Sequence, residues 1–233
     1  MKRSVVLILV LLVLSVAGIL GYKFIFPPRP VEIVVEETTT QRSWILMDTI
    51  VDVRVDGPNS EQLVDEVFAT MEELESKLSR FLDESEVSLI NNNAGEWVEV
   101  SPIALDVIEL GISLGELTQG AFDITIGAVL ELWGFGTGFY YVPTEAELAE
   151  ALATVDYRQV EVDRTSGKVR IPAGTVLDLG GIAKGFIVDR AIDRLRDAGV
   201  SRAIINAGGD LSVIGRRPAE VPWCVGVQAP AAQ

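Results

Sequence analysis

The sequence predicts an α+β domain with a mainly antiparallel sheet and packed helices. Short strand-like runs and amphipathic helical runs follow one another without strict alternation, and two of the strand-like runs flank a four-residue turn, as in a hairpin. The 233 residues contain 48% hydrophobic residues, which allows a substantial core. The sequence has no internal repeat and no low-complexity tract. These features favour one folded domain over a solenoid or a disordered chain.

The first 25 residues are predicted to form a signal-anchor or transmembrane segment. Basic residues at positions 2 and 3 precede an uncharged, mostly apolar stretch from Ser4 to Tyr22, which is long enough to cross a bilayer and favours a cytoplasmic N-terminus. Residues 26–42 form a Pro-containing linker, and residues 43–233 form the domain. We expect that domain on the extracytoplasmic (periplasmic) face of the cytoplasmic membrane. Cleavage at the small residues of 16–18 is the alternative to an uncleaved anchor.

The charge balance and the missing residue types exclude several classes of function. The net charge is −15, and residues 1–30 contain four basic residues and no acidic one, so the remainder carries −19. We therefore expect no nucleic acid partner. The chain contains no histidine, which excludes Ser-His-Asp triads and zinc sites with histidine ligands, so that a metal here would need oxygen ligands, as magnesium and calcium do. The single Cys224 excludes an internal disulfide.

Each expected element follows from a local pattern. Trp44 to Val55 alternates as a strand, and apolar residues recur at helical spacing from Ser60 to about Leu82, after an Asn59 and Gln62 pair that resembles a capping box. The further expected helices span about 102–118, 144–153 (capped by Thr144 with Glu147) and the residues that follow Gly185 up to Gly199. The further expected strands span 157–162 and 168–171 (a hairpin), 203–205, 211–214 and 223–227.

The run Asp178 to Gly185 (DLGGIAKG) carries the densest chemistry. A carboxylate, three glycines and a cation lie where an apolar strand is expected to turn into a helix. The first N–H groups of a helix lack internal partners and its dipole favours negative charge, so this junction suits a nucleotide phosphate. The run matches neither the Walker A loop nor the dinucleotide-binding turn, and plain turn geometry is the alternative. A second pair, Gly208-Gly209, is expected to return to the same neighbourhood.

A glycine-aromatic region precedes this run. Residues 120–125 (GAFDIT) and 132–136 (LWGFG) combine flat rings, flexible backbone and the carboxylate of Asp123. Such a composition is typical of a pocket for a planar heterocycle. The alternative is a loop held by aromatic packing, in which Asp123 caps a turn.

Six motifs occur in the order that is found in ApbE-type FAD:protein FMN transferases, and the chain resembles that family from about Ser43 to Pro230. The motifs are MDT at 47–49, Phe81 with DESE at 83–86, AFDIT at 121–125, LWGF at 132–135, DLGGIAKG at 178–185 and NAGGD at 206–210.

The resemblance implies a reaction and a site. FAD would be split at its pyrophosphate with Mg2+, and its FMN part would be joined through phosphate to a Thr or Ser hydroxyl of an acceptor protein, with release of AMP. By resemblance, the FAD site comprises Met47, Phe81, Ala121, Phe122, Asp123, Asp178 and Lys184. The carbonyl of Gly181 would bind the metal, and no catalytic residue is assigned. Met47 and Phe81 are equally compatible with core packing, and Asp178 with the dipole of the following helix.

The sequence also departs from the family pattern. Members of the family continue beyond the strand that here ends near Pro230, with a histidine and an Asp-plus-Thr motif that completes the metal site, whereas this chain ends at Gln233. Asp48 replaces the glycine that is common between Met and Thr in the first motif. Either the flavin transferase domain is C-terminally incomplete in this sequence, or the protein has lost the chemistry. An FAD-binding exported protein without transferase activity and a non-catalytic exported interaction domain remain as alternatives.

Overall fold

The computed structural model describes residues 38–227. The chain divides into two compact units, residues 1–36 and 37–233, and the described residues all lie in the second. The expected membrane segment and most of the linker lie outside the described residues. Within 38–227, no helix is both long enough and apolar enough to cross a membrane.

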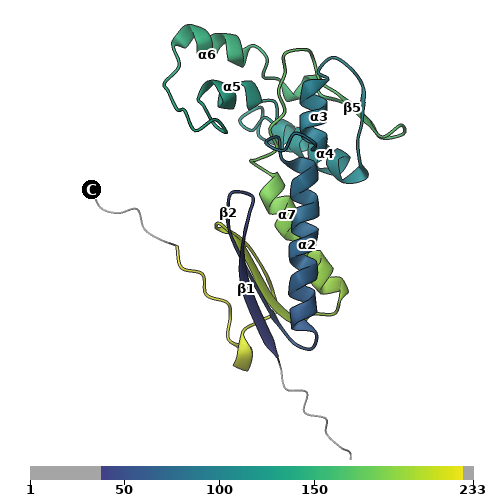
Figure 1. Cartoon of the computed structure of the whole chain (residues 1–233), viewed down its shortest axis with the longest axis vertical. Coiled ribbons are helices and arrows are strands. Elements are labelled where there is room, and N and C mark those ends of the chain that lie inside the picture. Colours follow the sequence, from purple (N-terminus) through teal and green to yellow (C-terminus); the bar gives the residue numbers. More distant parts are fainter. Residues whose placement is uncertain (1–37, 228–233) are drawn as a thin grey trace, which may run out of the picture. The chain divides into compact units, whose positions relative to one another are not determined.

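The described residues form an α+β fold with antiparallel sheets (Figure 1), which confirms the predicted class. The helices are α2 (Ser60–Leu78), α3 (Glu86–Asn92), α4 (Pro102–Leu117), α5 (Gly127–Leu132), α6 (Glu145–Leu152) and α7 (Ala183–Asp197), with 3-10 turns at Tyr157–Gln159 and Pro218–Glu220. The strands are β1 (Thr39–Leu46), β2 (Thr49–Asp56), β3 (Val98–Glu99), β4 (Glu161–Asp163), β5 (Lys168–Arg170), β6 (Arg202–Ala207) and β7 (Asp210–Ile214).

The larger sheet has the order β1-β2-β6-β7 with every pair antiparallel. Alternate residues of β2, Val51, Val53 and Val55, are completely buried, as the period of a half-buried strand requires. Helix α2 packs on β1 and β2, α7 packs on β6 and β7, and the two helices contact each other (Figure 1). Because Val51 of β2 pairs with Ala207 at the end of β6, the β6–β7 turn lies at the same end of the sheet as the β1–β2 turn.

A smaller sheet has the order β3-β5-β4. The expected hairpin at 157–171 is confirmed for β4 and β5, with a 3-10 turn at Tyr157–Gln159 in place of the first strand residues. The capping box at Thr144 and Glu147 is also confirmed, because Thr144 Oγ1 accepts from the Glu147 N–H and the Glu147 carboxylate accepts from the Thr144 N–H. Both predictions succeeded because the signals are local.

The expected single strand from Trp44 to Val55 was wrong. The segment is a hairpin, in which Met47 and Asp48 form a two-residue turn with φ of 52° and 54° between the paired residues Leu46 and Thr49. Two-residue turns with a positive φ at both residues favour glycine. A sequence that has Met-Asp at these positions therefore lacks the usual hairpin signal.

Other boundaries also differ from the expectation. Helix α2 ends at Leu78 and not near Leu82, because Ser79 is extended with a ψ of 119°. The expected cap at Asn59 is absent, since this residue has a φ of 59° and its side chain makes no cap hydrogen bond. Residues 223–227 form no strand. Helices α3 and α5 were missed because seven and six residues are too few to display a helical period.

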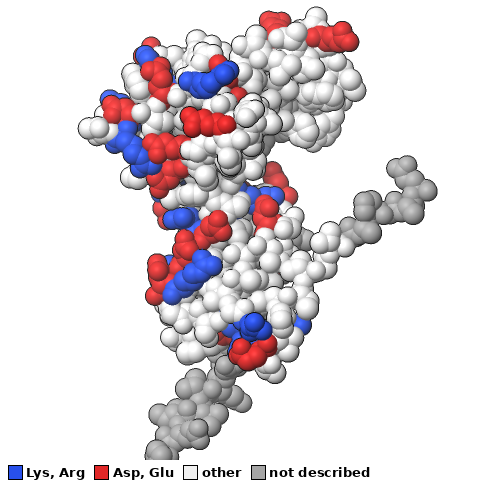
Figure 2. All heavy atoms as spheres, turned by 180° about the vertical axis from the view of Figure 1, so that it is seen from behind, with Lys and Arg blue, Asp and Glu red and all other residues white. Residues whose placement is uncertain are grey.

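Acidic and basic side chains are interspersed over the face in Figure 2. Several form exposed ion pairs, such as Arg164 with Asp106 at 2.7 Å and Arg170 with Glu161 at 2.7 Å. Exposed pairs of this kind contribute about 0–1 kcal/mol each. The burial of apolar side chains between the sheet and its two helices therefore stabilises the fold more than its surface charges do.

Candidate functional site

A cavity of about 200 Å³ lies where the β1–β2 turn, the end of α2 and the start of α7 meet. The residues that line it are Met47, Asp48, Glu75, Leu78, Ser79, Arg80, Phe81, Asp178, Leu179, Gly180, Ala183, Lys184 and Ile187. Four of the residues that were expected to bind FAD are among them: Met47, Phe81, Asp178 and Lys184. The fold thus brings together side chains that lie up to 137 positions apart in the sequence.

The β1–β2 turn is fastened to α2. The backbone N–H of Met47 donates to Oε1 of Glu75 at 2.9 Å. Burial raises the pKa of the Glu75 carboxyl; the Met47 hydrogen bond acts in the opposite direction, and the nearby charges of Asp48 and Glu72 raise the pKa further. The turn therefore places Met47 and a carboxyl group that resists ionisation on the wall of the cavity.

Asp178 is buried, and both of its oxygens are engaged. Oδ1 accepts from the N–H of Gly180 at 2.7 Å, and Oδ2 accepts from Nε of Arg80. The Asp178 N–H in turn donates to the carbonyl of Ile124 at 2.8 Å. Asp178 lines the cavity as expected, and its contacts show that it also fixes the glycine loop that leads into α7.

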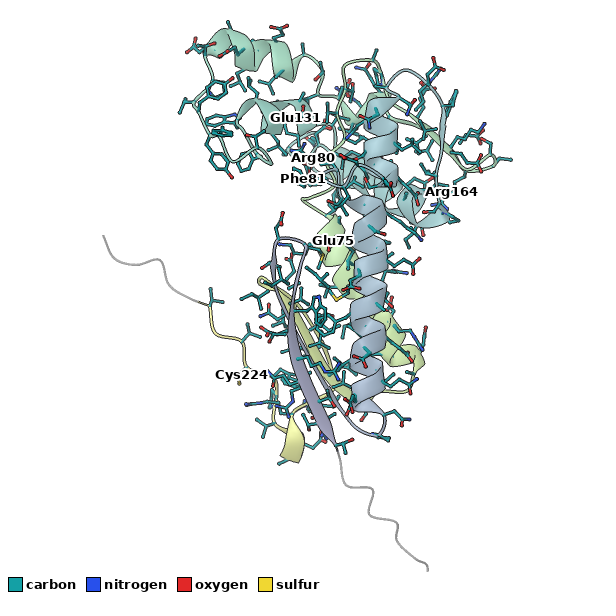
Figure 3. The ribbon with its side chains drawn as sticks, viewed as in Figure 1. Glu75, Arg80, Phe81, Glu131, Arg164 and Cys224 are labelled. Carbon is teal, nitrogen blue, oxygen red and sulfur yellow. The ribbon has the colours of Figure 1, made fainter. Side chains whose placement is uncertain are left out.

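Arg80 is a site residue that the sequence analysis missed. Its side chain is only 7% exposed; Nη1 lies 3.2 Å from Oε1 of Glu131, and the guanidinium carbon lies 4.4 Å from the centre of the Phe81 ring. Figure 3 shows Arg80 and Phe81 beside Glu131, with Glu75 of α2 lower in the view. An arginine just after a helix carries no local signal of such a role, because its partners Glu131 and Asp178 are distant in sequence.

Lys184 combines with the start of α7 to make a cationic side of the cavity. The first turn of α7 contains Lys184 and no acidic side chain, so the ammonium group and the positive end of the helix dipole lie together. Within residues 38–227, Lys184 forms no ion pair. A partly buried lysine beside a helix N-terminus is suited to bind an anion such as a phosphate.

Ala121, Phe122 and Asp123 do not line the cavity, but Phe122 contacts the glycine loop before α7. A Cβ atom added to Gly181 would lie 2.9 Å from Cε2 of Phe122, so the ring packs directly on that glycine. Asp123 serves the fold: Oδ1 accepts from the N–H and the hydroxyl of Thr125, and Oδ2 accepts from the N–H of Tyr157. The two bonds to Thr125 are those expected if Asp123 caps a turn, which was the alternative to a ligand-binding role.

The second glycine pair lies near the first hairpin turn and outside the cavity wall. Gly208 has a φ of 60°, its N–H donates to the carbonyl of Ile50 at 3.1 Å, and a Cβ atom there would overlap the side chain of Thr49. Gly209 N–H donates to Oδ1 of Asn206 at 3.0 Å. The two glycine corners reach the same end of the sheet, but only the corner at Gly180 borders the cavity.

The metal expectation has limited support in the described part of the chain. Gly181 lies in the loop before α7 and is exposed. Residues 38–227 contain no group of three or more His, Cys, Asp or Glu side chains that could hold a metal ion. The described side chains therefore do not form a carboxylate-rich metal site.

Comparison with known proteins identifies the family of this chain. The ApbE family model matches residues 47–233. The chain belongs to the ApbE family. The FAD:protein FMN transferase of Haemophilus influenzae is 30% identical over 178 residues, which cover 73% of this chain and 51% of the relative. The enzyme of the same name from Treponema pallidum is 30% identical over 213 residues, which cover 81% and 58%.

Solved structures of the ApbE family have the same fold. The ApbE protein of Thermotoga maritima matches with a TM-score of 0.79 and 33% identity over 84% of this chain and 65% of its own. The flavin transferase ApbE of Vibrio cholerae matches with a TM-score of 0.76 and 29% identity over 83% and 65%. This ApbE-family chain spans about half the length of the curated relatives that it matches.

Proposed function

We propose that this chain is the FAD-binding region of an FAD:protein FMN transferase. The proposal rests on one observation: in this ApbE-family fold, a single cavity is lined by Met47, Phe81, Asp178 and Lys184. Relatives that are 30% identical carry the name of this activity.

The cavity suits part of a dinucleotide. Its 200 Å³ is below the roughly 300–1,000 Å³ of sites that enclose a whole drug-sized ligand. We infer that it encloses one portion of FAD while the rest lies along the surface. Lys184 and the N-terminus of α7 would bind the diphosphate, and the half-exposed ring of Phe81 would contact a flat heterocycle.

The proposed reaction is a phosphoryl transfer to a Thr or Ser hydroxyl of an acceptor protein. A bond forms between the hydroxyl oxygen and the phosphorus of the FMN part, the phosphoanhydride bond to AMP breaks, AMP leaves with the bridging oxygen, and the hydroxyl proton is released. Lys184 would counter the charge that develops on the phosphates. No residue is assigned as the proton acceptor.

Magnesium dependence is part of the proposal, with Gly181 as a carbonyl ligand. Because the described residues hold no carboxylate cluster, no step of the mechanism is assigned to the metal. We also propose that the protein acts at the cytoplasmic membrane, with this domain on its extracytoplasmic face. That proposal rests on the apolar sequence of residues 4–22.

The experiment that tests the function uses the 233-residue chain, FAD, Mg2+ and an acceptor protein with Thr at the modified position. We expect FAD binding and covalent flavin fluorescence on the acceptor, and a loss of both in Lys184→Met. Lys168→Met, which lies outside the cavity, should behave as the parent chain. An acceptor with Val in place of Thr should remain unlabelled.

A second candidate is an FAD-binding protein that does not transfer FMN, which the lack of a carboxylate cluster in residues 38–227 favours. FAD binding without labelling of the acceptor, in Mg2+ and after its removal with a chelator, would support this candidate. No FAD binding by the folded chain would contradict both.

A further inference from the structure

The guanidinium group of Arg80 has a donor that the fold leaves unused. Nε donates to Asp178 and Nη1 to Glu131. Within residues 38–227, Nη2 is buried and has no hydrogen-bond partner. Buried donors are normally paired, and an arginine can donate five hydrogen bonds, so an unpaired buried Nη2 on a residue that lines the cavity indicates a ligand atom.

The surroundings of Arg80 hold this donor in a fixed position. Its backbone carbonyl accepts from the hydroxyl of Ser88 at 3.0 Å, and the two carboxylates hold the guanidinium from two other segments. The Phe81 ring lies against the guanidinium at 4.4 Å, and it also packs on Gly136, where a Cβ atom would overlap it. The hydroxyl of Ser88, the two carboxylates and the Phe81 ring thus determine where Nη2 can donate.

The local charges indicate what kind of acceptor atom Nη2 can donate to. One guanidinium faces the two carboxylates of Asp178 and Glu131, so its positive charge is already compensated. A further anion would gain little attraction there, whereas Lys184 forms no ion pair within residues 38–227 and lies at a helix N-terminus. A neutral acceptor satisfies Nη2 without adding a third negative charge.

We propose that Arg80 recognises the edge of a heterocyclic base, by donating from Nη2 to a ring carbonyl oxygen or a ring nitrogen while the ring plane lies near Phe81. This inference rests on the proposed function, and it divides the site: Lys184 binds phosphate and Arg80 binds a base. The base is the isoalloxazine or the adenine of FAD.

The test compares Arg80→Lys with the parent chain. Lysine keeps the charge beside Asp178 but has no second nitrogen that could replace Nη2. Dissociation constants for FAD, FMN, ADP and inorganic pyrophosphate are measured by calorimetry, and urea unfolding checks the fold. Arg164→Lys, which changes an exposed arginine paired with Asp106 of α4, is the matched control. We expect about tenfold weaker FAD binding, unchanged pyrophosphate binding, and a loss for FMN or ADP that identifies the base.

Glu131→Gln is a second variant that does not depend on the stability of Arg80→Lys. If Nη2 binds an anion instead, removal of this carboxylate should strengthen binding of FAD and pyrophosphate, and the strengthening should decrease with salt. If it binds a neutral acceptor, pyrophosphate affinity should not change.

The outcomes separate the inference from the function. FAD binding that is equal in Arg80→Lys and the parent, or a loss of pyrophosphate binding as large as the loss for FAD, would overturn the role of Arg80 and leave the proposed function intact. A parent chain that is folded and binds no FAD would overturn both.

Discussion

Arg80 and Asp178 form an ion pair in which both side chains are buried, at 7% and 9% exposure. The pair joins the segment after α2 to the glycine loop before α7, and it thereby connects the two halves of the cavity wall. A buried charge without its partner is costly, so each member depends on the other. This pair explains why a residue that was expected to bind FAD also matters for folding.

Asp178→Ala should lower the free energy of unfolding by about 3–5 kcal/mol, because it leaves the charge of Arg80 buried beside only the half-exposed Glu131. Urea unfolding measures this loss. FAD affinity, measured where the variant is folded, should also fall, because the Gly180 loop loses its hydrogen bond to Oδ1.

The double variant Arg80→Met with Asp178→Leu is the control for that prediction. Apolar residues of similar size should recover most of the stability, since they remove both charges together, but not the FAD affinity. A loss of less than 1 kcal/mol in the single variant would mean that the pair is not buried in solution.

The glycine run offers a pair of substitutions with opposite expected effects. A Cβ atom at Gly181 would press on the Phe122 ring, whereas a Cβ atom at Gly185 would meet no atom within 4 Å. Gly185→Ala should stabilise the helix by about 0.5–1 kcal/mol and Gly181→Ala should destabilise the protein and weaken FAD binding. Thermal unfolding and FAD titration measure both. Equal effects at the two positions would contradict the contact with Phe122.

Local patterns could be predicted from the sequence, and distant contacts could not. The capping box at Thr144 and the alternation of Val51, Val53 and Val55 depend on neighbours within a few residues, and both were predicted correctly. The motif residues Met47, Phe81, Asp178 and Lys184 were selected by family resemblance, and the fold places them in one cavity.

What the sequence left open depends on tertiary contacts. The role of Arg80 requires partners 51 and 98 positions away. The carboxylate of Asp123 fits a ligand site as well as a turn, and its bond to the Tyr157 N–H, 34 positions away, could not be predicted from its sequence neighbours. The hairpin at Met47 was missed because the apolar alternation on its two sides reads as one strand.

Asp48→Gly should stabilise the protein by up to about 1 kcal/mol. Asp48 has a φ of 54°, in the left-handed region that costs a non-glycine residue about 1–2 kcal/mol, and the greater freedom of glycine in the unfolded chain offsets part of the gain. Urea unfolding measures the change. As a control, Asp189→Gly within α7 should destabilise by about 0.3 kcal/mol, the difference between the helix propensities of Asp and Gly. If Asp48→Gly destabilised the protein, the Asp48 carboxylate would stabilise the folded state by more than the positive φ of this residue costs.

Glu75→Gln should make the protein more stable at neutral pH. Burial first, and then Asp48 and Glu72, raise the pKa of Glu75 in the folded protein above its ordinary value of 4.5. The folded state therefore binds more protons than the unfolded state just above pH 4.5, and stability falls as the pH rises through the folded pKa. Glutamine can still accept the Met47 N–H and has no charge to desolvate.

The measurement is urea unfolding of Glu75→Gln and the parent chain between pH 4 and 8. The advantage of the variant should be present at pH 7 and disappear below about pH 4.5, where Glu75 is protonated in both states. Glu73→Gln, two residues away on α2, is the matched control with the opposite sign, because the hydrogen bond from Lys77 lowers the pKa of Glu73. Glu73→Gln should therefore lose stability above pH 4.5 and match the parent well below it. If Glu75→Gln instead lost stability at pH 7, the carboxylate would be stabilised by its neighbours, and the raised pKa would be wrong.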